Sequence, residues 1–417
     1  MTKRIAIIGG GISGLSCGQL LKEKGFDIIL YEKDSRPGGM IKCDRVEGSL
    51  FHRTGGHVFN TKREDVMQWF WSFFDKEGQF TKTQRNSSVV MSDGKMVPYP
   101  IENHAYMLDR EDGEKIVSDL VGMAKGYSKE PANFEEFLKS RFGNTLYHLY
   151  FKPYNWKVWR RDLTKVPLSW LEGKLPMPTV AEIIFANIYH VEERQFVHSS
   201  FYYPKQGGSQ FLADTFAKGL DIRYNTNVET IQKTAKGWEI NGEVADRVVF
   251  CGNIKQLPEI LGNSVDINAY TDAIEKLEFH GTTSVFCEID KNPYSWIYQP
   301  SMEHLSHRII CTGNFSESNN ADGKMTGTVE FTDEISKEDI IEQLKRMPFA
   351  PKYMAHNYEK YTYPIQDRDT REMISSLKKL LESNGLSLCG RFAEWEYANM
   401  DVCIGYAMDL VNRRFKK

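Results

Sequence analysis

Apolar and polar residues alternate in patterns that predict strands and helices from the start of the chain. Residues 4–33 read RIAIIGGGISGLSCGQLLKEKGFDIILYEK. A β-branched apolar run is followed by glycines, by apolar residues at helical spacing and by a second apolar run, which predicts a strand, a glycine turn, a helix and a strand. Residues 62–80 and 105–150 are predicted to be helical, because stretches such as FEEFLKSRFGNTLYHLYF repeat apolar positions at spacings of three and four.

The second half of the chain is dominated by patterns of short strands. Residues 201–220 predict a strand, a glycine turn and a helix, and residues 221–253 predict successive short strands. Strand-like runs between Thr282 and Glu330 alternate with turn residues and predict an antiparallel sheet. Residues 384–415 predict a strand, a glycine turn and a long helix, so we expect the end of the chain to return to the first strands.

The first predicted turn carries a dinucleotide-binding pattern. Gly9, Gly11 and Gly14 form G-x-G-x-x-G between strand and helix, where missing side chains let backbone N–H groups approach a pyrophosphate. Glu32 ends the second predicted strand, where its carboxylate can accept hydrogen bonds from ribose hydroxyls. Together these features predict a bound dinucleotide.

Two further glycine clusters favour FAD as that dinucleotide. RPGG, residues 36–39, places Gly39 just past the acidic residue, which resembles FAD-binding flavoproteins more than NAD dehydrogenases. TGGHVFN, residues 54–60, adds Gly56 and His57 where such proteins run backbone beside the isoalloxazine. His57 either touches the flavin or is an ordinary surface or core histidine, and the sequence leaves both interpretations open.

A chain of 417 residues suggests two or three domains of about 150 residues each. We expect an α/β fold, in which a Rossmann-type FAD-binding domain carries an inserted helical domain and an antiparallel β-sheet domain. The expected domains are an FAD-binding domain of residues 1–80, 200–265 and 380–417, a helical substrate or cap domain of residues 105–199, and a sheet domain of residues 81–104 and 266–379.

Charge and composition narrow the classes of partner. With a net charge of −3 and 12% aromatic residues, the chain has no global basic field. FKPYNWKVWRR, residues 151–161, is locally basic and aromatic, which suits one or a few phosphates, so no nucleic acid partner is expected. Taken alone, Trp156 and Trp159 fit a core better than a ligand platform, and Arg160 and Arg161 fit solvated or paired residues.

The seven cysteines are widely spread and form no C-x-x-C pair, which predicts reduced, mostly buried thiols in a cytoplasmic protein. No apolar run reaches the roughly 18 residues of a membrane span, so no membrane insertion is expected. The sequence offers no H-E-x-x-H or other compact ligand spacing, so no metal is predicted.

Nine blocks, in order along nearly the whole chain, resemble one family: the flavin-dependent UDP-galactopyranose mutases, relatives of the amine oxidases and protoporphyrinogen oxidases. The blocks are GGGISG, RPGG, GGHVFNT, VPYPIEN, KPYNWKVW, YPKQGG, HRII, YTYPI and GRFAEWEYANMD. Their order implies membership of the family, and the family's functional residues can be carried over where the blocks match.

The resemblance implies a nucleotide-sugar site in which Tyr154 and Trp159 flank the ligand and Arg308, Tyr363 and Tyr397 meet its diphosphate. Without the resemblance, Arg308 fits a surface position as well, and the two tyrosines fit packing positions. The remaining FAD-binding residues that the resemblance implies are Val228 on the adenine side, Gly390, Arg391, Met400 and Asp401.

Two positions depart from the family's pattern. Lys174, in EGKLP, stands where the family has a second diphosphate arginine, and lysine offers one mobile ammonium in place of a planar fork. Asn399, in YANMD, stands where bacterial members often carry aspartate. The identity of the nucleotide and of the sugar is therefore left open.

The resemblance implies an isomerase that interconverts pyranose and furanose forms of a nucleoside-diphosphate sugar. N5 of reduced FAD attacks the anomeric carbon, the nucleoside diphosphate leaves, and the flavin-sugar adduct opens and recloses as the other ring size. FAD is thus the catalytic group, with His57 and Arg308 supporting it. NAD(P)H or another reductant supplies the electrons, and a homodimer is compatible with the resemblance.

Two other functional hypotheses are alternatives to a mutase. An FAD oxidase or dehydrogenase of the amine-oxidase or protoporphyrinogen-oxidase type shares GGGISG and RPGG but predicts an apolar substrate pocket. A nucleotide-sugar binder that has lost turnover is the non-enzymatic alternative, and Lys174 encourages it. VPYPIEN and YNWKVW favour the mutase.

Overall fold

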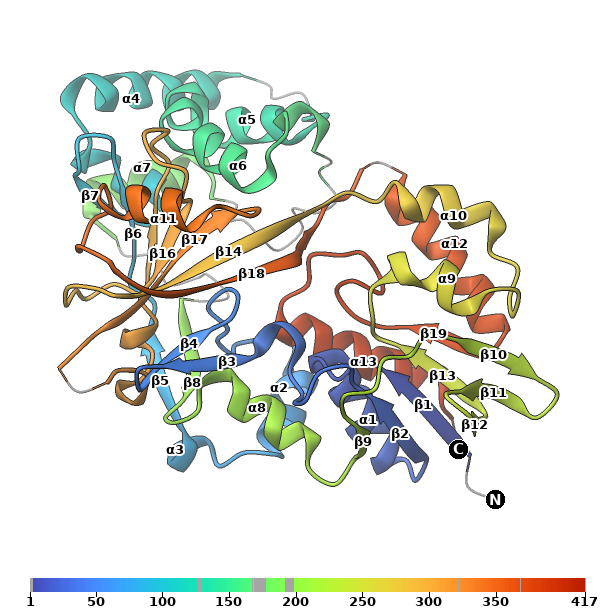
Figure 1. Ribbon diagram of the computed structural model, residues 1–417. Coiled ribbons are helices and arrows are strands. Elements are labelled where there is room, and N and C mark those ends of the chain that lie inside the picture. The colour runs from blue at the N-terminus through green and yellow to red at the C-terminus, as the bar shows by residue number, and fades with distance from the viewer. Residues whose placement is uncertain are drawn as a thin grey trace.

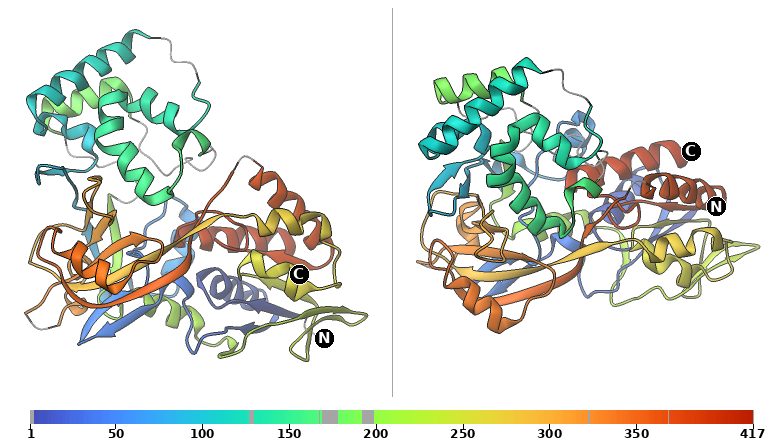
Figure 2. Two further views of the ribbon diagram at one scale, coloured as in Figure 1. Left: turned by 45° about the horizontal axis from the view of Figure 1, so that its top comes forward. Right: turned by 90° about the horizontal axis from the view of Figure 1, so that it is seen from above.

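The computed structural model describes residues 3–126, 130–166, 168, 178–191, 199–321, 323–367 and 369–416. Its helices and strands form two connected parts, one built on a parallel sheet and one on a larger mixed sheet that carries a group of helices (Figures 1 and 2). The predicted α/β class is confirmed.

A five-stranded parallel sheet forms the core of the first part. Its strands, in spatial order, are β19 (Leu386–Leu388), β13 (Arg247–Phe250), β1 (Arg4–Ile8), β2 (Asp27–Tyr31) and β9 (Asp221–Arg223). Strand β1 is apolar on both sides, because Ile5 and Ile7 pack into one layer and Ala6 and Ile8 into the other. Both faces of this sheet are therefore covered, as expected of a parallel sheet.

Helices cover one face of the parallel sheet, and a mixed layer covers the other (Figure 1). The first layer contains α1 (Ile12–Glu23), α2 (Glu64–Trp71), α8 (Gly208–Ala217) and α13 (Met400–Arg414). The second contains β10 (Ile231–Thr234), β11 (Gly237–Ile240), β12 (Glu243–Ala245), α9 (Leu257–Leu261), α10 (Asn268–Glu275) and α12 (Thr370–Ser383). The predicted elements of residues 4–33, 201–253 and 384–415 are confirmed.

Two details differ from the sequence prediction. Residues 62–80 form two helices, α2 and α3 (Lys76–Gln79), because Asp75 caps the second helix by accepting a hydrogen bond from the Gly78 N–H. Helix α10 and residues 370–379 of α12 fall in the range predicted for the sheet domain, but the apolar residues of both helices belong to the second layer of the parallel sheet.

A seven-stranded sheet forms the core of the second part. Its strands, in spatial order, are β18 (Lys352–Pro364), β14 (Phe279–Glu288), β17 (Thr326–Thr332), β16 (Arg308–Ile310), β15 (Trp296–Tyr298), β6 (Ser87–Val90) and β7 (Met96–Pro98). Neighbouring strands run antiparallel, as predicted, except that β15 and β6 are parallel. Helix α11 (Lys337–Leu344) covers one face of this sheet.

A group of helices lies over the other face of the seven-stranded sheet (Figure 1). It comprises η2 (Ile101–Met107), α4 (Arg110–Lys125), α5 (Phe134–Leu146), the π-helical turn η3 (Tyr147–Phe151), α6 (Lys152–Trp159), η4 (Leu163–Lys165) and α7 (Val180–Tyr189). The helical prediction for residues 105–150 is confirmed for most of the described residues, although α4 ends at Lys125 and α5 begins at Phe134, and residues 127–129 lie outside the described residues. The helices and the sheet share one apolar cluster, to which α6 contributes Trp159 and the sheet contributes Tyr298 and Ile310.

Smaller elements connect these layers. They are η1 (Gly39–Ile41), β3 (Cys43–Val46), β4 (Ser49–His52), β5 (Phe80–Gln84), β8 (Ser200–Pro204), η6 (Ile254–Gln256), η7 (Thr312–Asn314), η8 (Glu317–Asn319). Strand β5 pairs with β8, and β3 pairs with β4. Among the described residues, none of the helices combines the length and apolar character needed to cross a bilayer.

Candidate functional site

The glycine turn after β1 is closed so tightly that side chains could not fit within it. Gly9 has a φ of +104°, and a Cβ on Gly14 would lie 1.9 Å from the Gly9 carbonyl oxygen. Gly11 caps the start of α1, whose first turn holds no acidic residue. The turn thus presents bare backbone and the positive end of a helix, which suit a pyrophosphate.

A second glycine turn lies against the first. The Gly38 N–H donates to the Gly10 carbonyl oxygen at 2.8 Å, and a Cβ on Gly39 would lie 3.1 Å from the Gly11 Cα. Gly38 and Gly39 both have positive φ, +128° and +53°. The two predicted glycine motifs therefore lie against each other and form one continuous stretch of backbone without side chains.

Glu32 lies at the end of β2, as the dinucleotide pattern requires. Its carboxylate is buried and accepts hydrogen bonds from the Gly10 N–H at 2.7 Å and the Asp34 N–H at 2.9 Å. Val228 lies in the segment next to Glu32. Two residues before Val228, the Thr226 N–H donates to the Glu32 carbonyl oxygen at 2.9 Å. Both predicted residues are thus at the same edge of the parallel sheet.

The end of the chain meets the glycine turns from the other side. Gly390, which follows β19, has a φ of +115°, and a Cβ there would lie 2.6 Å from Ser13 Oγ on α1. Met400 and Asp401 form the first turn of α13, which belongs to the same apolar cluster as α1. The cradle of glycines fits an extended dinucleotide, and these residues would flank it.

His57 and Gly56 lie where the parallel-sheet part meets the seven-stranded sheet. A Cβ on Gly56 would lie 2.7 Å from Ile310 of β16. Burial, together with the nearby charge of Arg391, lowers the pKa of His57 to about 4, so its imidazole is neutral at pH 7. His57 Nε2 is buried and makes no hydrogen bond within the described part of the chain, which suits it to meet a ligand.

The register of the seven-stranded sheet places three functional side chains side by side. Tyr298 on β15 lies opposite Arg308 on β16, and Arg308 lies opposite Glu330 on β17. Because side chains alternate along a strand, all three occupy one face, while Ile309 and Val329 point to the other face under α11. The face that carries Tyr298, Arg308 and Glu330 is the one covered by the group of helices η2 to α7.

Arg308 is the central cation of this face. Its Nε donates to the Glu330 carboxylate, and its Nη2 donates to the Tyr363 hydroxyl at 3.4 Å. Burial lowers the pKa of Arg308, but Glu330 together with Tyr363 and the other nearby tyrosines raises it, and the pKa lies well above its usual range. Burial likewise raises the pKa of Glu330, and Arg308 and His307 reverse this, so the carboxyl is ionised.

Aromatic rings surround the guanidinium. Tyr363 stacks on Tyr397 with ring centroids 5.4 Å apart, and Arg391 lies 4.1 Å above the Tyr397 ring. Trp159 contacts Tyr363 edge-on at 6.0 Å. A small pocket lies beside this group, and its wall includes Trp159, Tyr397 and Gln366.

Tyr154 completes the group from α6. It packs edge-on against Tyr298 at 5.4 Å, and burial raises its pKa well above the usual range while the charge of Arg308 opposes the rise. The structure thus brings together five of the predicted substrate residues: Tyr154, Trp159, Arg308, Tyr363 and Tyr397. Asn399 is exposed and caps α13. Lys174 lies outside the described residues.

Two residues of this region escaped the sequence analysis. Glu330 is fully buried and accepts a hydrogen bond from the Gly55 N–H at 2.8 Å, so it links Arg308 to the loop that carries His57. Lys157 of α6 is also buried, at 1% exposure, and donates to carbonyl oxygens of the loop that leads to Arg308. Glu330 lies on the next strand and far from Arg308 in the sequence, so it gave no local signal, whereas Lys157 stood inside the basic, aromatic stretch already noted.

The remaining residues of that stretch behave as ordinary structural residues. Arg161 pairs with Glu278 at 3.2 Å, and Arg160 lies 5.0 Å above the ring of Trp156, which is exposed. Trp159 is 5% exposed. The cysteines are free and six of the seven are buried, which confirms the prediction of mostly buried thiols.

The chain is similar to flavoproteins of several activities. The family of flavin containing amine oxidoreductases matches residues 12–347. dTDP-fucopyranose mutase of Escherichia coli is 23% identical, with 97% of each chain covered. Coproporphyrinogen III oxidase of Staphylococcus aureus is 26% identical over 58% of this chain and 57% of the oxidase, so the chain spans little more than half of that relative.

A solved structure of reduced UDP-galactopyranose mutase superposes with a TM-score of 0.88 at 22% identity, and the match covers 99% of this chain and 94% of that one. At this identity the likeness concerns the fold, and it confirms the predicted Rossmann-type architecture with inserted helices and sheet. The resemblance to the mutase branch of the flavoproteins is confirmed as well. Because the family match spans most of the chain, this protein belongs to the flavin containing amine oxidoreductases, and a flavin is its cofactor.

Proposed function

We propose that this protein is a sugar-nucleotide mutase that uses FAD and interconverts the pyranose and furanose forms of a nucleoside-diphosphate sugar. The relatives that support the proposal are named for dTDP-fucopyranose and UDP-galactopyranose, and these two are the first candidate substrates. The free and mostly buried cysteines support a cytoplasmic location.

One observation carries the proposal: the half-buried Arg308 stands among tyrosines beside the loop predicted to border the flavin. Arg308 retains 19% side-chain exposure, and its Nη1 makes no hydrogen bond within the described residues, so the guanidinium can still take an anionic ligand. Glu330 connects it to the Gly55 N–H. An apolar oxidase substrate would gain nothing from this cation, whereas a diphosphate would.

The chain's own residues would bind, orient and shield the substrate. Arg308 would neutralise charge as the nucleoside diphosphate departs, and the Tyr363 hydroxyl would donate to a phosphate oxygen. Tyr154 and Trp159 would hold the nucleotide sugar against the sheet and exclude water. Each of these side chains is already fixed by the packing described above.

The glycine turns would hold the pyrophosphate of FAD, and Glu32 would hold its ribose. Reduced flavin, when bound, supplies a nucleophilic nitrogen to the anomeric carbon. His57 would approach the flavin as a neutral imidazole, because burial keeps its pKa low. Lys174 would supply a second positive charge for the diphosphate.

The test is turnover by the flavin-loaded protein. Protein reduced with dithionite, or with NAD(P)H, is incubated with a panel of UDP- and dTDP-sugars, and the ring size of each product is read by chromatography and NMR. We expect ring interconversion of one sugar by reduced protein and none by oxidised protein. Absence of interconversion across the panel, with oxygen consumed on addition of amines or porphyrinogens, would instead support the oxidase alternative, which the partial match to coproporphyrinogen III oxidase favours.

A further inference from the structure

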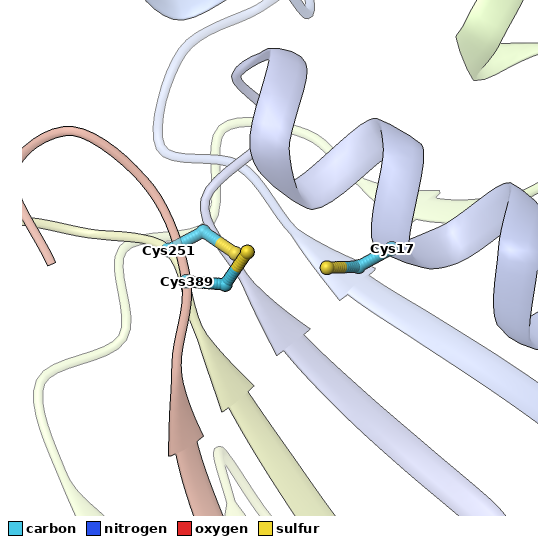
Figure 3. A group of neighbouring side chains, drawn as sticks. All are labelled: Cys17, Cys251 and Cys389. Atoms are coloured by element: carbon cyan, nitrogen blue, oxygen red, sulfur yellow. The ribbon is translucent and has the colours of Figure 1, made fainter. Parts of the chain in front are cut away.

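Three cysteines from distant parts of the sequence meet behind the glycine turn. Cys17 lies on α1, Cys251 directly follows β13, and Cys389 directly follows β19 (Figure 3). Their three sulfur atoms all lie within 4.8 Å of one another. Cys17 and Cys389 are completely buried, and Cys251 is partly exposed.

The order of the parallel sheet creates this cluster. Phe250 and Leu388 are register partners on neighbouring strands, so the next residue of each strand, a cysteine in both cases, leaves the sheet at the same level. The Cys389 N–H donates to the Phe250 carbonyl oxygen at 3.0 Å, and the Cys251 N–H donates to that of Ile8 at 2.8 Å. Cys17, on the neighbouring helix α1, completes the group.

We propose that Cys17, Cys251 and Cys389 form a binding site for a trivalent, thiol-seeking ion, with arsenite as the probe that reveals it. Thiol sulfur is a soft ligand and selects soft ions over hard ones such as Mg²⁺ or Ca²⁺. In the described part of the chain, this is the only group of three or more potential ligand side chains close enough to share an ion. It belongs neither to the glycine turns nor to the tyrosine-lined site.

Charge decides which soft ion fits. All three cysteines pack in the apolar cluster between α1 and the parallel sheet, so a net charge at this site would have little access to water. Three thiolates around Zn²⁺ or Cu⁺ would leave net negative charge in this buried place, which is costly. Three thiolates around trivalent arsenic form a neutral complex.

The exchange with arsenite balances without any redox step. Arsenous acid, As(OH)₃, reacts with three thiols: three As–S bonds form, three As–O bonds break, and each thiol proton leaves with a hydroxide as water. The three thiols enter protonated and the product is neutral, so the exchange leaves no net charge at the site. The partly exposed Cys251 offers the first point of attack.

A bound ion would link three segments that lie next to the glycine turns: α1, the end of β13 and the end of β19. A Cβ on Gly9 would lie 3.1 Å from the Cys251 carbonyl oxygen, and Cys389 immediately precedes Gly390. The ion would therefore tie α1 to the ends of β13 and β19. Since it binds only the folded arrangement, it is expected to raise the melting temperature, by about 2 °C or more at saturation.

The experiment uses the flavin-loaded protein in a phosphine reductant, with arsenite added and free arsenite removed. Native mass spectrometry is expected to show one arsenic per chain, and X-ray absorption at the arsenic edge to show three sulfur neighbours. The single variants Cys17→Ala, Cys251→Ala and Cys389→Ala are expected to lose the arsenic. Cys287→Ala, which removes a buried thiol of β14, is the matched control and is expected to keep it.

Arsenic that persists in all three single variants, or that disappears equally in the control, would overturn the proposal. Oxygen neighbours in the absorption spectrum of the unaltered protein would overturn it too, and this measurement decides the matter even if a variant fails to fold. Flavin absorbance of each variant reports whether the fold is kept. None of these readouts depends on mutase activity, so failure of the proposed function would leave the test intact.

Discussion

Arg308 on β16 lies opposite Glu330 on β17, and its Nε donates to the carboxylate of this fully buried partner. The second oxygen of Glu330 accepts a hydrogen bond from the Gly55 N–H at 2.8 Å. A single carboxylate therefore positions both the cation of the proposed substrate site and the loop beside the proposed flavin site. Removing either charge of this pair alone leaves the other buried and uncompensated.

Arg308→Met is expected to abolish nucleotide-sugar binding and to lower the free energy of unfolding by about 3 kcal/mol or more, because Glu330 is left as an unpaired buried charge. The double variant Arg308→Met/Glu330→Gln is expected to regain most of that stability without regaining binding. Isothermal titration with UDP and dTDP, together with urea unfolding, separates the two effects. Full affinity in the stable double variant would remove Arg308 from the substrate site.

Lys157→Met tests the anchor between α6 and the loop before Arg308. The ammonium donates to the carbonyl oxygens of Gln299 at 2.8 Å and Ser306 at 2.9 Å, and also to that of Ser301. The variant leaves these carbonyl groups without their donor, so we expect a loss of about 1–3 kcal/mol in the free energy of unfolding. We also expect a raised KM for the nucleotide sugar with flavin retained.

The matched control for this variant is Lys152→Met, which changes an exposed lysine at the start of the same helix. It is expected to leave both stability and KM unchanged within error. Equal changes in stability and KM for the two variants would show that the positive charge of α6 causes them and that the hydrogen bonds of Lys157 do not.

His52 gives the fold a dependence on pH. Burial lowers its pKa to about 3, from an ordinary value of 6.5 that the unfolded chain retains. Between about pH 3 and pH 6.5 His52 is protonated in the unfolded chain but neutral in the folded protein. The free energy of unfolding therefore falls as the pH drops below about 6.5, and this group has no effect above that pH. The expected slope is about 1.4 kcal/mol per pH unit for this one group.

Urea unfolding at pH 5, 6 and 7.5 measures this slope. His52→Gln is expected to flatten it, at some cost in overall stability because His52 Nε2 contacts the Tyr203 hydroxyl at 2.8 Å. His148→Gln alters an exposed histidine of the helical group and is expected to leave the slope as it is. Because burial also lowers the pKa of His57, part of the slope is expected to remain in His52→Gln, and a slope that is not reduced at all would contradict the assignment.

Gly14→Ala tests the glycine cradle. Its new Cβ would lie 1.9 Å from the Gly9 carbonyl oxygen, so the turn must open and flavin retention is expected to fall sharply. Gly122→Ala on α4 meets open space and is expected to stabilise the helix by about 1 kcal/mol with flavin unchanged. The ratio of flavin absorbance to protein in each purified variant gives the result.

Local patterns explain what the sequence could predict. The glycine turn, α1 and β2 follow one another along the chain, so their spacing alone indicates a nucleotide site. Glu330 and the Cys17, Cys251 and Cys389 cluster depend on which distant strands become neighbours, and no local pattern carries that information. The burial of Lys157 was equally hidden, because alternation within the aromatic stretch does not show which side faces the sheet.

The order of strands in the parallel sheet determines how far this domain can fold while the chain is being synthesised. Strands β1 and β2 emerge first, but β13 joins β1 much later, β19 joins β13 later still, and α13 then packs against α1. Until α13 leaves the exit tunnel, the face of α1 that it covers stays exposed. Flavin capture is consequently expected only after α13 has emerged, and chains that lack α13 would expose this face to chaperones and proteases.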